Sequence, residues 1–263
     1  MAAGELSREL VAVVLAAGKG KRMHSPLPKV LHPLLGRPMI LYVLDLVRAV
    51  GADRTVVIVG HGWQQVAEAV RGDGVEIAIQ EPQLGTAHAV QQAEPALGDF
   101  AGDVLVLAGD SPLFTVRTLK RLVDEHRHTG AAATILTAWA DDPTGCGRIV
   151  LDEEGQLLRI VEEKDADPAT KAIRRVNTST YVFRATVLFE ALREVRNDNA
   201  QGEYYLTDVF EILRSKGSPV RTVLADSFEE TMGINTVEHL RRAEDILRKR
   251  LAHQGVSKGS EAT

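Results

Sequence analysis

Short apolar runs alternate with amphipathic segments of helical period through the first half of the chain, and this alternation limits the fold more than any other feature. The apolar runs predict strands over residues 11–15, 55–59, 75–79, 104–107 and 132–137. The segments between them predict helices over residues 39–50, 63–70, 86–96 and 115–128. Because strands that alternate with helices form parallel sheets, we expect an α/β fold with a Rossmann-like, mixed but mostly parallel sheet and helices on both faces.

The second half has a different pattern, which we expect to extend the sheet and to wall a pocket. Strands are predicted over residues 148–151, 157–162, 176–183 and 219–224, and helices over residues 185–195, 204–215 and 237–252. The predicted organisation is an N-terminal extension (1–9), one domain (10–240), a C-terminal helix (241–256) and a disordered tail (257–263).

Composition narrows the class of protein. The chain has 263 residues, 44% of them hydrophobic, which suits one large domain or two small ones. A formal net charge of −5 argues against a general nucleic-acid binder. The sequence has no apolar run long enough for a bilayer and no signal-peptide pattern, and its single cysteine, Cys146, fits a reducing compartment. We therefore expect a cytoplasmic protein without nucleic-acid or membrane partners.

A glycine-containing, basic loop follows the first predicted strand. Its sequence is Leu15-Ala16-Ala17-Gly18-Lys19-Gly20-Lys21-Arg22-Met23, with Pro28-Lys29 shortly after. Small residues let the backbone approach a ligand, and N–H groups and basic side chains bind phosphates. A dinucleotide fingerprint would need a third glycine at Met23, and the chain has no Walker A sequence. The loop therefore predicts a phosphate site of another kind.

The loop resembles that of the sugar-1-phosphate nucleotidylyltransferases, with Leu-Ala-Ala-Gly-x-Gly-x-Arg-Met followed by Pro-Lys-Val. Five further segments carry a narrower resemblance, at residues 80–89, 142–149, 160–166, 199–208 and 233–235. In order and spacing they resemble the uridyltransferase domain of the bacterial N-acetylglucosamine-1-phosphate uridyltransferases, a nucleotidyltransferase family with a GT-A-like fold. The resemblance spans roughly residues 10 to 240.

This resemblance implies transfer of UMP from UTP to N-acetylglucosamine-1-phosphate, giving UDP-N-acetylglucosamine, a peptidoglycan precursor, and pyrophosphate. The direct displacement would depend on Mg²⁺ and on neutralisation of crowded negative charge. Arg22 would hold the departing β- and γ-phosphates, and Lys29 would bridge the α-phosphate and the sugar phosphate. Asp110 and Asn235 would ligate Mg²⁺, which prefers oxygen ligands.

The resemblance also implies the residues that contact each substrate. The nucleotide would lie against Leu15, Ala16, Ala17, Gly18, Gln80, Gln83, Gly85, Thr86 and Gly109. The sugar would lie against Gly147, Glu162, Asn177, Glu203, Tyr205 and Thr207.

Other interpretations stay open at this point. Arg22 and Lys29 could be solvated surface charges, Asp110 a turn residue or cap, and Thr86 and Asn235 ordinary helix N-caps. The chain could be another sugar-1-phosphate nucleotidylyltransferase, using glucose-1-phosphate or dTTP, or a non-catalytic nucleotide-binding regulatory module. Three departures from the family pattern, at Ala108, Cys146 and Ser179, where the family has Tyr, Tyr and Gly in some or many members, leave the base and sugar preference open.

The familiar members are bifunctional and carry an acetyltransferase β-helix that forms trimers. No hexapeptide repeats follow the last predicted helix here. We therefore expect no acetyltransferase activity, and a monomer or weak homodimer that is either a stand-alone uridyltransferase or part of a longer protein.

Overall fold

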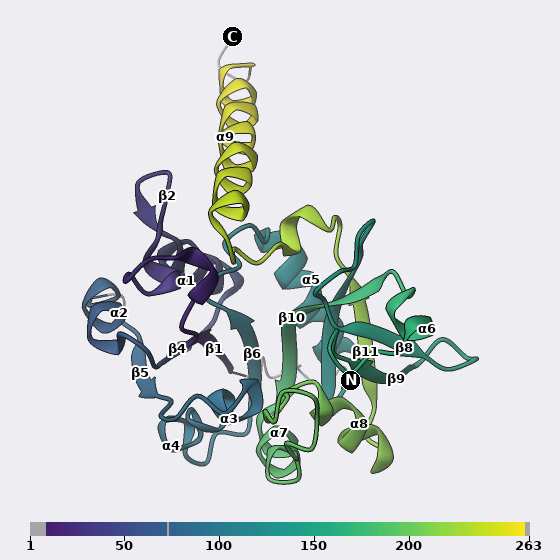
Figure 1. The fold of residues 1–263 in the computed structure, drawn as a ribbon. Coiled ribbons are helices and arrows are strands. Elements are labelled where there is room, and N and C mark those ends of the chain that lie inside the picture. The colour runs from purple at the N-terminus through teal and green to yellow at the C-terminus, as the bar shows by residue number, and fades with distance from the viewer. Residues whose placement is uncertain (1–8, 73, 261–263) are drawn as a thin grey trace, which may run out of the picture.

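A mixed β-sheet forms the centre of the protein, seen in a computed structural model that describes residues 9–72 and 74–260. The strand order is β11-β7-β10-β6-β1-β4-β5, with β8 paired to β10 and β9 to β8 (Figure 1). The strands are β1 (Leu10–Ala16), β4 (Arg54–Val59), β5 (Glu76–Ile79), β6 (Asp103–Ala108), β7 (Ala133–Trp139), β8 (Arg148–Leu151), β9 (Leu157–Val161), β10 (Arg175–Arg184) and β11 (Val220–Leu224).

Strand β1 is an interior strand of this sheet, and both of its faces are apolar. It pairs in parallel with β6 on one side and with β4 on the other, and β5 continues in parallel from β4. Strand β10 enters antiparallel between β6 and β7. The sheet is mixed, as predicted, and the carboxyl ends of β1 and β6 lie side by side, which is where ligands bind in such sheets.

Helices cover both faces of the sheet (Figure 1). The helices in the described part of the chain are α1 (Met39–Val50), α2 (Trp63–Ala69), α3 (Thr86–Gln91), α4 (Glu94–Leu97), α5 (Val116–Thr129), α6 (Pro168–Lys171), α7 (Ala185–Leu192), α8 (Asp208–Ser215) and α9 (Val237–Ser260), of which α9 projects away from the sheet. Short 3₁₀ turns are η1 (Lys21–Met23), η2 (Lys29–Leu31) and η3 (Glu229–Thr231), and a small hairpin consists of β2 (Pro33–Leu34) and β3 (Arg37–Pro38).

The sheet separates two hydrophobic cores, and alternate residues of β1 supply each one. Ala12 and Val14 join the core formed with α1, α2, α5 and the first turns of α9. Val11 and Val13 join the other core, formed with α3, α7 and α8. Successive side chains of β1 face opposite cores, and both cores are apolar. The sequence of β1 is therefore one continuous apolar run.

Three predicted helices differ from the structure, and one hairpin was not predicted. The predicted helix 86–96 is divided into α3 and α4, with a proline, which lacks an N–H donor, in the first turn of α4. The predicted helix 204–215 begins only at Asp208, because residues 204 and 206 bond to the start of α3 and to the loop before it. Helix α9 continues to Ser260, past the predicted ends at 252 and 256 and into the predicted tail, since no proline interrupts it. The β2–β3 hairpin was not predicted, because its two-residue strands are too short to show the apolar–polar alternation of a strand.

The predicted extension at 1–9 and the end of the predicted tail fall on residues 1–8 and 261–263, which lie outside the described residues. Among the described helices, none combines the length and the apolar character needed to cross a bilayer.

Candidate active site

Three side chains meet where the loop after β1, the end of β6 and the start of α9 come together. The Lys29 ammonium donates to the Asp110 carboxylate and, at 3.0 Å, to the side-chain oxygen of Asn235. The side chains of Lys29 and Asp110 are only 17% and 10% exposed, so the pair is well shielded from solvent. The structure thus brings together three of the four residues assigned to phosphate and metal chemistry.

Backbone bonds hold the three segments in this arrangement. The amide of Gly109 donates to the carbonyl of Leu15 at 2.9 Å, which joins the ends of β6 and β1. The amide of Ile234 donates to the carbonyl of Asp110, also at 2.9 Å, which seats the loop before α9 against β6. A Cβ on Gly109 would lie 3.2 Å from that Leu15 carbonyl, so the position favours glycine.

Gly20 explains why the loop after β1 needs its second glycine. Its φ of 59° is left-handed, which L-residues with a side chain adopt only at a cost. A Cβ at Gly20 would also lie 2.7 Å from the Cβ of Lys29. The glycine therefore lets the loop fold closely over Lys29.

Arg22 is not part of this cluster. It lies in η1, where Met23 is buried and anchors the turn, while Arg22 itself is exposed. In the described part of the chain it has no ion-pair partner. Its assignment to the departing phosphates stays a prediction.

The two oxygens that hold Lys29 fit a hard divalent cation. Asp110 and Asn235 offer a carboxylate and an amide oxygen that already converge on one positive charge. Within residues 9–72 and 74–260, no group of three or more His, Cys, Asp or Glu could hold a metal alone. Such oxygen ligands suit a hard divalent cation whose remaining coordination water and phosphate can complete.

Neither proposed metal ligand is a helix cap. Helix α5 is capped by Thr115, whose hydroxyl accepts from the Thr118 amide. At the start of α9 the Thr236 hydroxyl accepts from the His239 amide at 3.2 Å. The side chains of Asp110 and Asn235 are therefore free of capping roles.

The predicted nucleobase residues lie beside β1 and β4. Gln80 is 3% exposed and donates to the Gly85 carbonyl at 2.9 Å, while Gln83 donates to the Gln80 carbonyl at 3.0 Å. A Cβ on Gly60 would lie 2.8 Å from the Gln83 amide nitrogen. Both glutamines line an open pocket of about 360 Å³ with residues 19, 60–64 and 81. Leu15 and Ala16 end β1 next to it, and Ala17 and the exposed Gly18 follow.

Gly85 and Thr86 connect the predicted nucleotide side to the predicted sugar side. Gly85 is the N-cap of α3, and the Thr86 hydroxyl instead accepts from the Leu206 amide at 3.0 Å. Thr86 is thus not the N-cap that the sequence allowed. The Tyr204 amide donates to the Leu84 carbonyl and the Ala87 amide to the Tyr204 carbonyl, at 2.8 and 2.9 Å. The segment before α8 is thus bonded to the start of α3 and to the loop before it.

Glu162, Thr207 and Gly147 gather on the predicted sugar side. The Thr207 hydroxyl donates to the Glu162 carboxylate at 3.2 Å, and burial raises the pKa of Glu162. A Cβ on Gly147 would lie 3.3 Å from both Glu162 oxygens. Glycine at 147 therefore keeps this carboxylate accessible.

Asn177 is held in a fixed orientation beside them. Its side-chain oxygen accepts from the Ser179 amide at 2.8 Å, and its amide nitrogen donates to the Tyr181 hydroxyl at 2.9 Å. Tyr181 is 3% exposed, and burial, with the nearby Glu162 charge, raises its pKa. Sequence reasoning placed Tyr181 only in a strand, because no local pattern reports a contact made across a bulge.

The remaining predicted sugar residues follow α7. Tyr205 is 7% exposed, its hydroxyl accepts from the Gln201 side chain at 2.8 Å, and burial raises its pKa to about 12. The backbone amide and carbonyl of Glu203 are both bonded to the side chain of Asn199, which sequence reasoning did not single out. Glu203 is thereby held by its backbone, with its side chain partly exposed.

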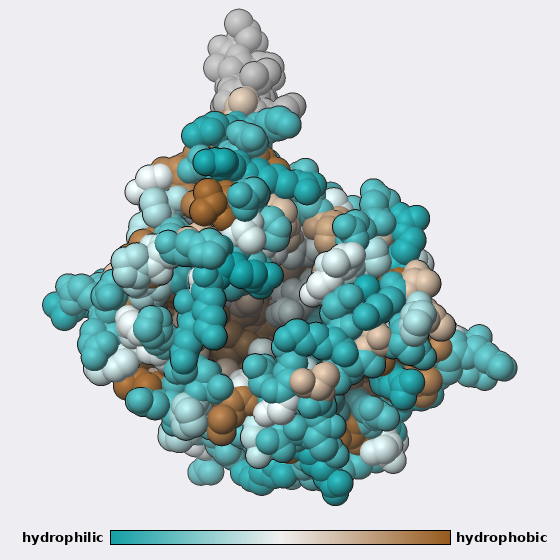
Figure 2. Space-filling view, in the orientation of Figure 1, coloured by the Kyte–Doolittle hydropathy of each residue, from teal (hydrophilic) through white to brown (hydrophobic). Residues whose placement is uncertain are grey.

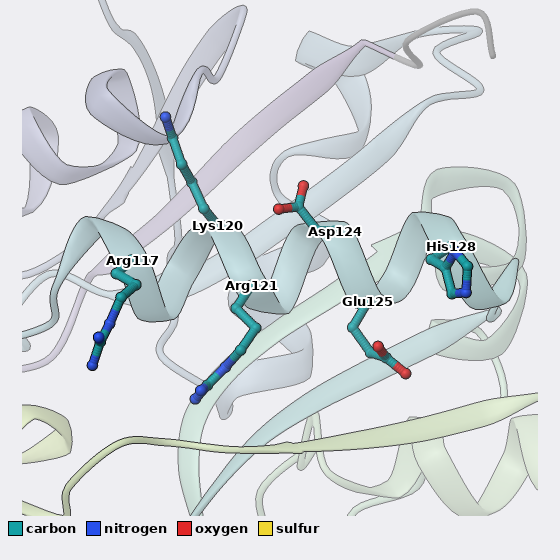
Figure 3. A pocket seen from close by; sticks show the side chains of 6 residues that line it. All are labelled: Arg117, Lys120, Arg121, Asp124, Glu125 and His128. Carbon is teal, nitrogen blue, oxygen red and sulfur yellow. The ribbon is translucent and has the colours of Figure 1, made fainter. Parts of the chain in front are cut away.

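The face shown in Figure 2 is hollowed between the elements of the first half and those of the second, within a hydrophilic rim. A shallow depression of about 560 Å³ lies along α5 (Figure 3). Two of its lining residues, Arg117 and Arg121, pair with Asp226. No predicted site residue lines the depression on α5.

Comparison with known proteins agrees with the predicted resemblance. The chain is 52% identical over 248 residues to a protein of Exiguobacterium sibiricum named bifunctional protein GlmU, covering 94% of this chain and 55% of that one. Proteins of the same name from Geobacillus thermodenitrificans and Pelotomaculum thermopropionicum are each 50% identical, over 94% and 95% of this chain and 54% and 55% of theirs. The chain thus spans about half the length of these relatives.

The fold also matches a solved structure. A UDP-glucose pyrophosphorylase complexed with UDP-glucose superposes with a TM-score of 0.73 over 92% of this chain and 99% of that one, at 15% identity. At this identity the match supports the fold alone. Residues 12–215 match the model of the MobA-like NTP transferase domain. The chain belongs to the MobA-like NTP transferase family.

Proposed function

We propose that this chain transfers UMP from UTP to N-acetylglucosamine-1-phosphate, releasing pyrophosphate and UDP-N-acetylglucosamine. The observation that carries the proposal is the junction of Lys29 with Asp110 and Asn235 at the adjoining ends of β1 and β6. The 50% identity to the GlmU proteins supports the substrate pair. Family membership suggests a divalent metal, and the oxygen ligands favour Mg²⁺.

The chemistry requires two polyanions to approach each other. A cation held by Asp110 and Asn235 would polarise the α-phosphate and screen its charge. Lys29, within reach of the same oxygens, would donate to the α-phosphate and the sugar phosphate and orient the attacking oxygen. No protein nucleophile is needed for a direct displacement. Arg22, on the exposed turn η1, would neutralise the departing pyrophosphate.

The sugar side offers convergent hydrogen-bonding groups. Glu162 and Asn177 lie beside Gly147, and Thr207 donates to Glu162. Each of these three side chains keeps donor or acceptor capacity beyond its bonds within the protein. The nucleobase side offers the amides of Gln80 and Gln83 next to the small residues of the β1 loop. This division supports one pocket for the base and another for the sugar, with the phosphates between them.

The proposal is tested by measuring pyrophosphate release with UTP, Mg²⁺ and N-acetylglucosamine-1-phosphate. Chelator should abolish turnover, and Asp110→Ala should nearly do so, whereas Asp124→Ala on the exposed side of α5 should not. Full activity in excess chelator would contradict the metal assignment. A folded wild-type protein that binds UTP without turnover would favour the regulatory module instead.

One further expectation concerns assembly. Light scattering at micromolar concentration should give a monomer or weak homodimer, because Ala243 and Ile246 of α9 pack into the protein's own core. A stable trimer would contradict it.

A further inference from the structure

A buried carboxylate connects the two chain segments that lead to the metal-site residues. Glu230 lies in η3, between β11 and α9, and is 1% exposed. Its neighbour Glu229 is exposed. Buried carboxylates are costly unless they are well hydrogen-bonded, so the surroundings of Glu230 must repay its desolvation.

The partners of Glu230 are hydrogen-bond donors from two parts of the chain. From the start of α5 it accepts the Thr115 amide at 3.2 Å and the Thr118 hydroxyl at 2.9 and 3.0 Å. From its own loop it accepts the amides of Asp226 at 3.0 Å and Ser227 at 3.4 Å. No lysine or arginine pairs with it among the described residues, and the N-terminus of α5 supplies the favourable field.

These bonds form one side of a closed ring of chain, whose other side lies at the proposed metal ligands Asp110 and Asn235. One segment runs from Asp110 to Thr115 and the other from Glu230 to Asn235. Glu230 joins them at one end, and the Ile234 amide, bonded to the Asp110 carbonyl at 2.9 Å, joins them at the other. The separation of the Asp110 and Asn235 oxygens therefore depends on both links.

We propose that Glu230 is a positioning residue, which fixes the loop of Asn235 against β6 so that the oxygens of Asp110 and Asn235 converge on one cation. The role of Glu230 in fixing the loop rests on its hydrogen bonds alone. Its effect on metal binding rests on the proposed function.

Substitution by glutamine is the sharpest test, because it keeps the size and shape of the side chain. Each Glu230 oxygen accepts at least one backbone amide, from Thr115 on one side and from Asp226 and Ser227 on the other. Whichever oxygen is replaced by an NH₂ group, at least one backbone N–H then faces another donor and loses its hydrogen bond. Glu229→Gln is the matched control, since it changes the same residue type in the same turn at an exposed position.

The first measurement is amide hydrogen exchange of the ligand-free protein. In Glu230→Gln the Ile234 amide should exchange at least about tenfold faster than in wild type, while the amides of β1 keep their wild-type rates. Glu229→Gln should change neither. An unchanged Ile234 rate, or equal acceleration at Ile234 and in β1, would overturn the proposal. If Glu230→Gln does not fold, Thr118→Val removes one of the same bonds and is judged by the same criteria.

The second measurement is the metal requirement of turnover. In Glu230→Gln the Mg²⁺ concentration for half-maximal rate should rise by about tenfold, with the KM for N-acetylglucosamine-1-phosphate little changed. A metal requirement equal to that of Glu229→Gln would overturn the metal part. The exchange experiment contains no substrate, so its result does not depend on whether the protein catalyses the proposed reaction.

Discussion

The Lys29 ammonium forms an ion pair with the Asp110 carboxylate, joining the loop after β1 to the end of β6 across 81 residues of sequence. Asn235 completes the contact with its side-chain oxygen. One cation thus already lies between the two oxygens proposed to hold a metal ion. Breaking such a shielded pair from one side leaves an uncompensated charge, so substitution at either residue should have a large effect.

Replacement of Lys29 should abolish most activity. Lys29→Ala is expected to lower kcat by about 10² to 10³-fold, or roughly 3 to 4 kcal/mol of barrier, because one preorganised positive charge is lost from the phosphates. Lys120→Ala, an exposed lysine on α5, is the control. Steady-state kinetics with saturating substrates measure the change. Near-wild-type turnover of Lys29→Ala would show that the pair is only structural.

Tyr181 should affect the sugar rather than the nucleotide. Tyr181→Phe removes only the hydroxyl that accepts from Asn177, so Asn177 loses the contact that fixes its amide. We expect the KM for N-acetylglucosamine-1-phosphate to rise by about tenfold, the scale of one hydrogen bond, with the KM for UTP unchanged. The buried Phe183→Leu, in the same strand, controls for packing. Equal effects on both KM values would refute this role.

Ser179 should be a site where glycine stabilises the fold. Ser179 has φ of 56°, at the bulge where the β10–β7 register shifts between Asn177 and Tyr181. A serine there carries left-handed strain, and the bond from its amide to Asn177 does not need its side chain. Ser179→Gly should raise the unfolding free energy by about 1 kcal/mol, measured by urea denaturation.

The matched change is Ser218→Gly, in a loop where φ is not positive. Ser218→Gly should leave stability unchanged or lower it, because no backbone strain is relieved there and glycine raises the conformational entropy of the unfolded chain. If both variants shift stability equally, strain at Ser179 is not the cause.

Asp208 should make stability depend on pH. Burial, followed by the charges of Glu211 and Glu162, raises the pKa of Asp208 to about 6. Because the folded protein then holds its proton more tightly than the unfolded chain does, the contribution of Asp208 to stability falls as pH rises from about 4 to about 6. Above this window the charged, partly buried group destabilises the fold.

Asp208→Asn removes this titration. Its melting temperature relative to wild type should increase between pH 4 and pH 7, and Asp124→Asn, at an exposed position on α5, should show no such trend. A constant difference across this range would contradict the assignment.

Much of the fold follows from local pattern. Helix α1 has the predicted bounds and β1 lies within one or two residues of them, because both bury continuous or periodic apolar faces. The insertion of β10 between β6 and β7 could not be read in this way, since pairing between distant strands leaves no mark on either sequence. The start of α8 was missed for the same reason, because Leu206, just before it, bonds to Thr86 at the start of α3, 120 residues away.

The candidate site was likewise only partly predictable from the sequence. The resemblance assigned Lys29 to the phosphates and Asp110 and Asn235 to the metal, and in the structure the Lys29 ammonium contacts the side chains of both other residues. The residues that orient them, such as Tyr181 and Glu230, are ordinary strand and turn residues in the sequence. Their roles appear only when distant segments are brought together.

The central claim is tested most directly by a matrix of substrates in one assay of sugar-nucleotide formation. UTP and dTTP are each paired with N-acetylglucosamine-1-phosphate and glucose-1-phosphate in Mg²⁺, and products are separated by ion-exchange chromatography. The account predicts the highest kcat/KM for UTP with N-acetylglucosamine-1-phosphate, and formation of UDP-N-acetylglucosamine. A higher kcat/KM for any other pair, or no nucleotide-sugar from any of the four, would contradict it.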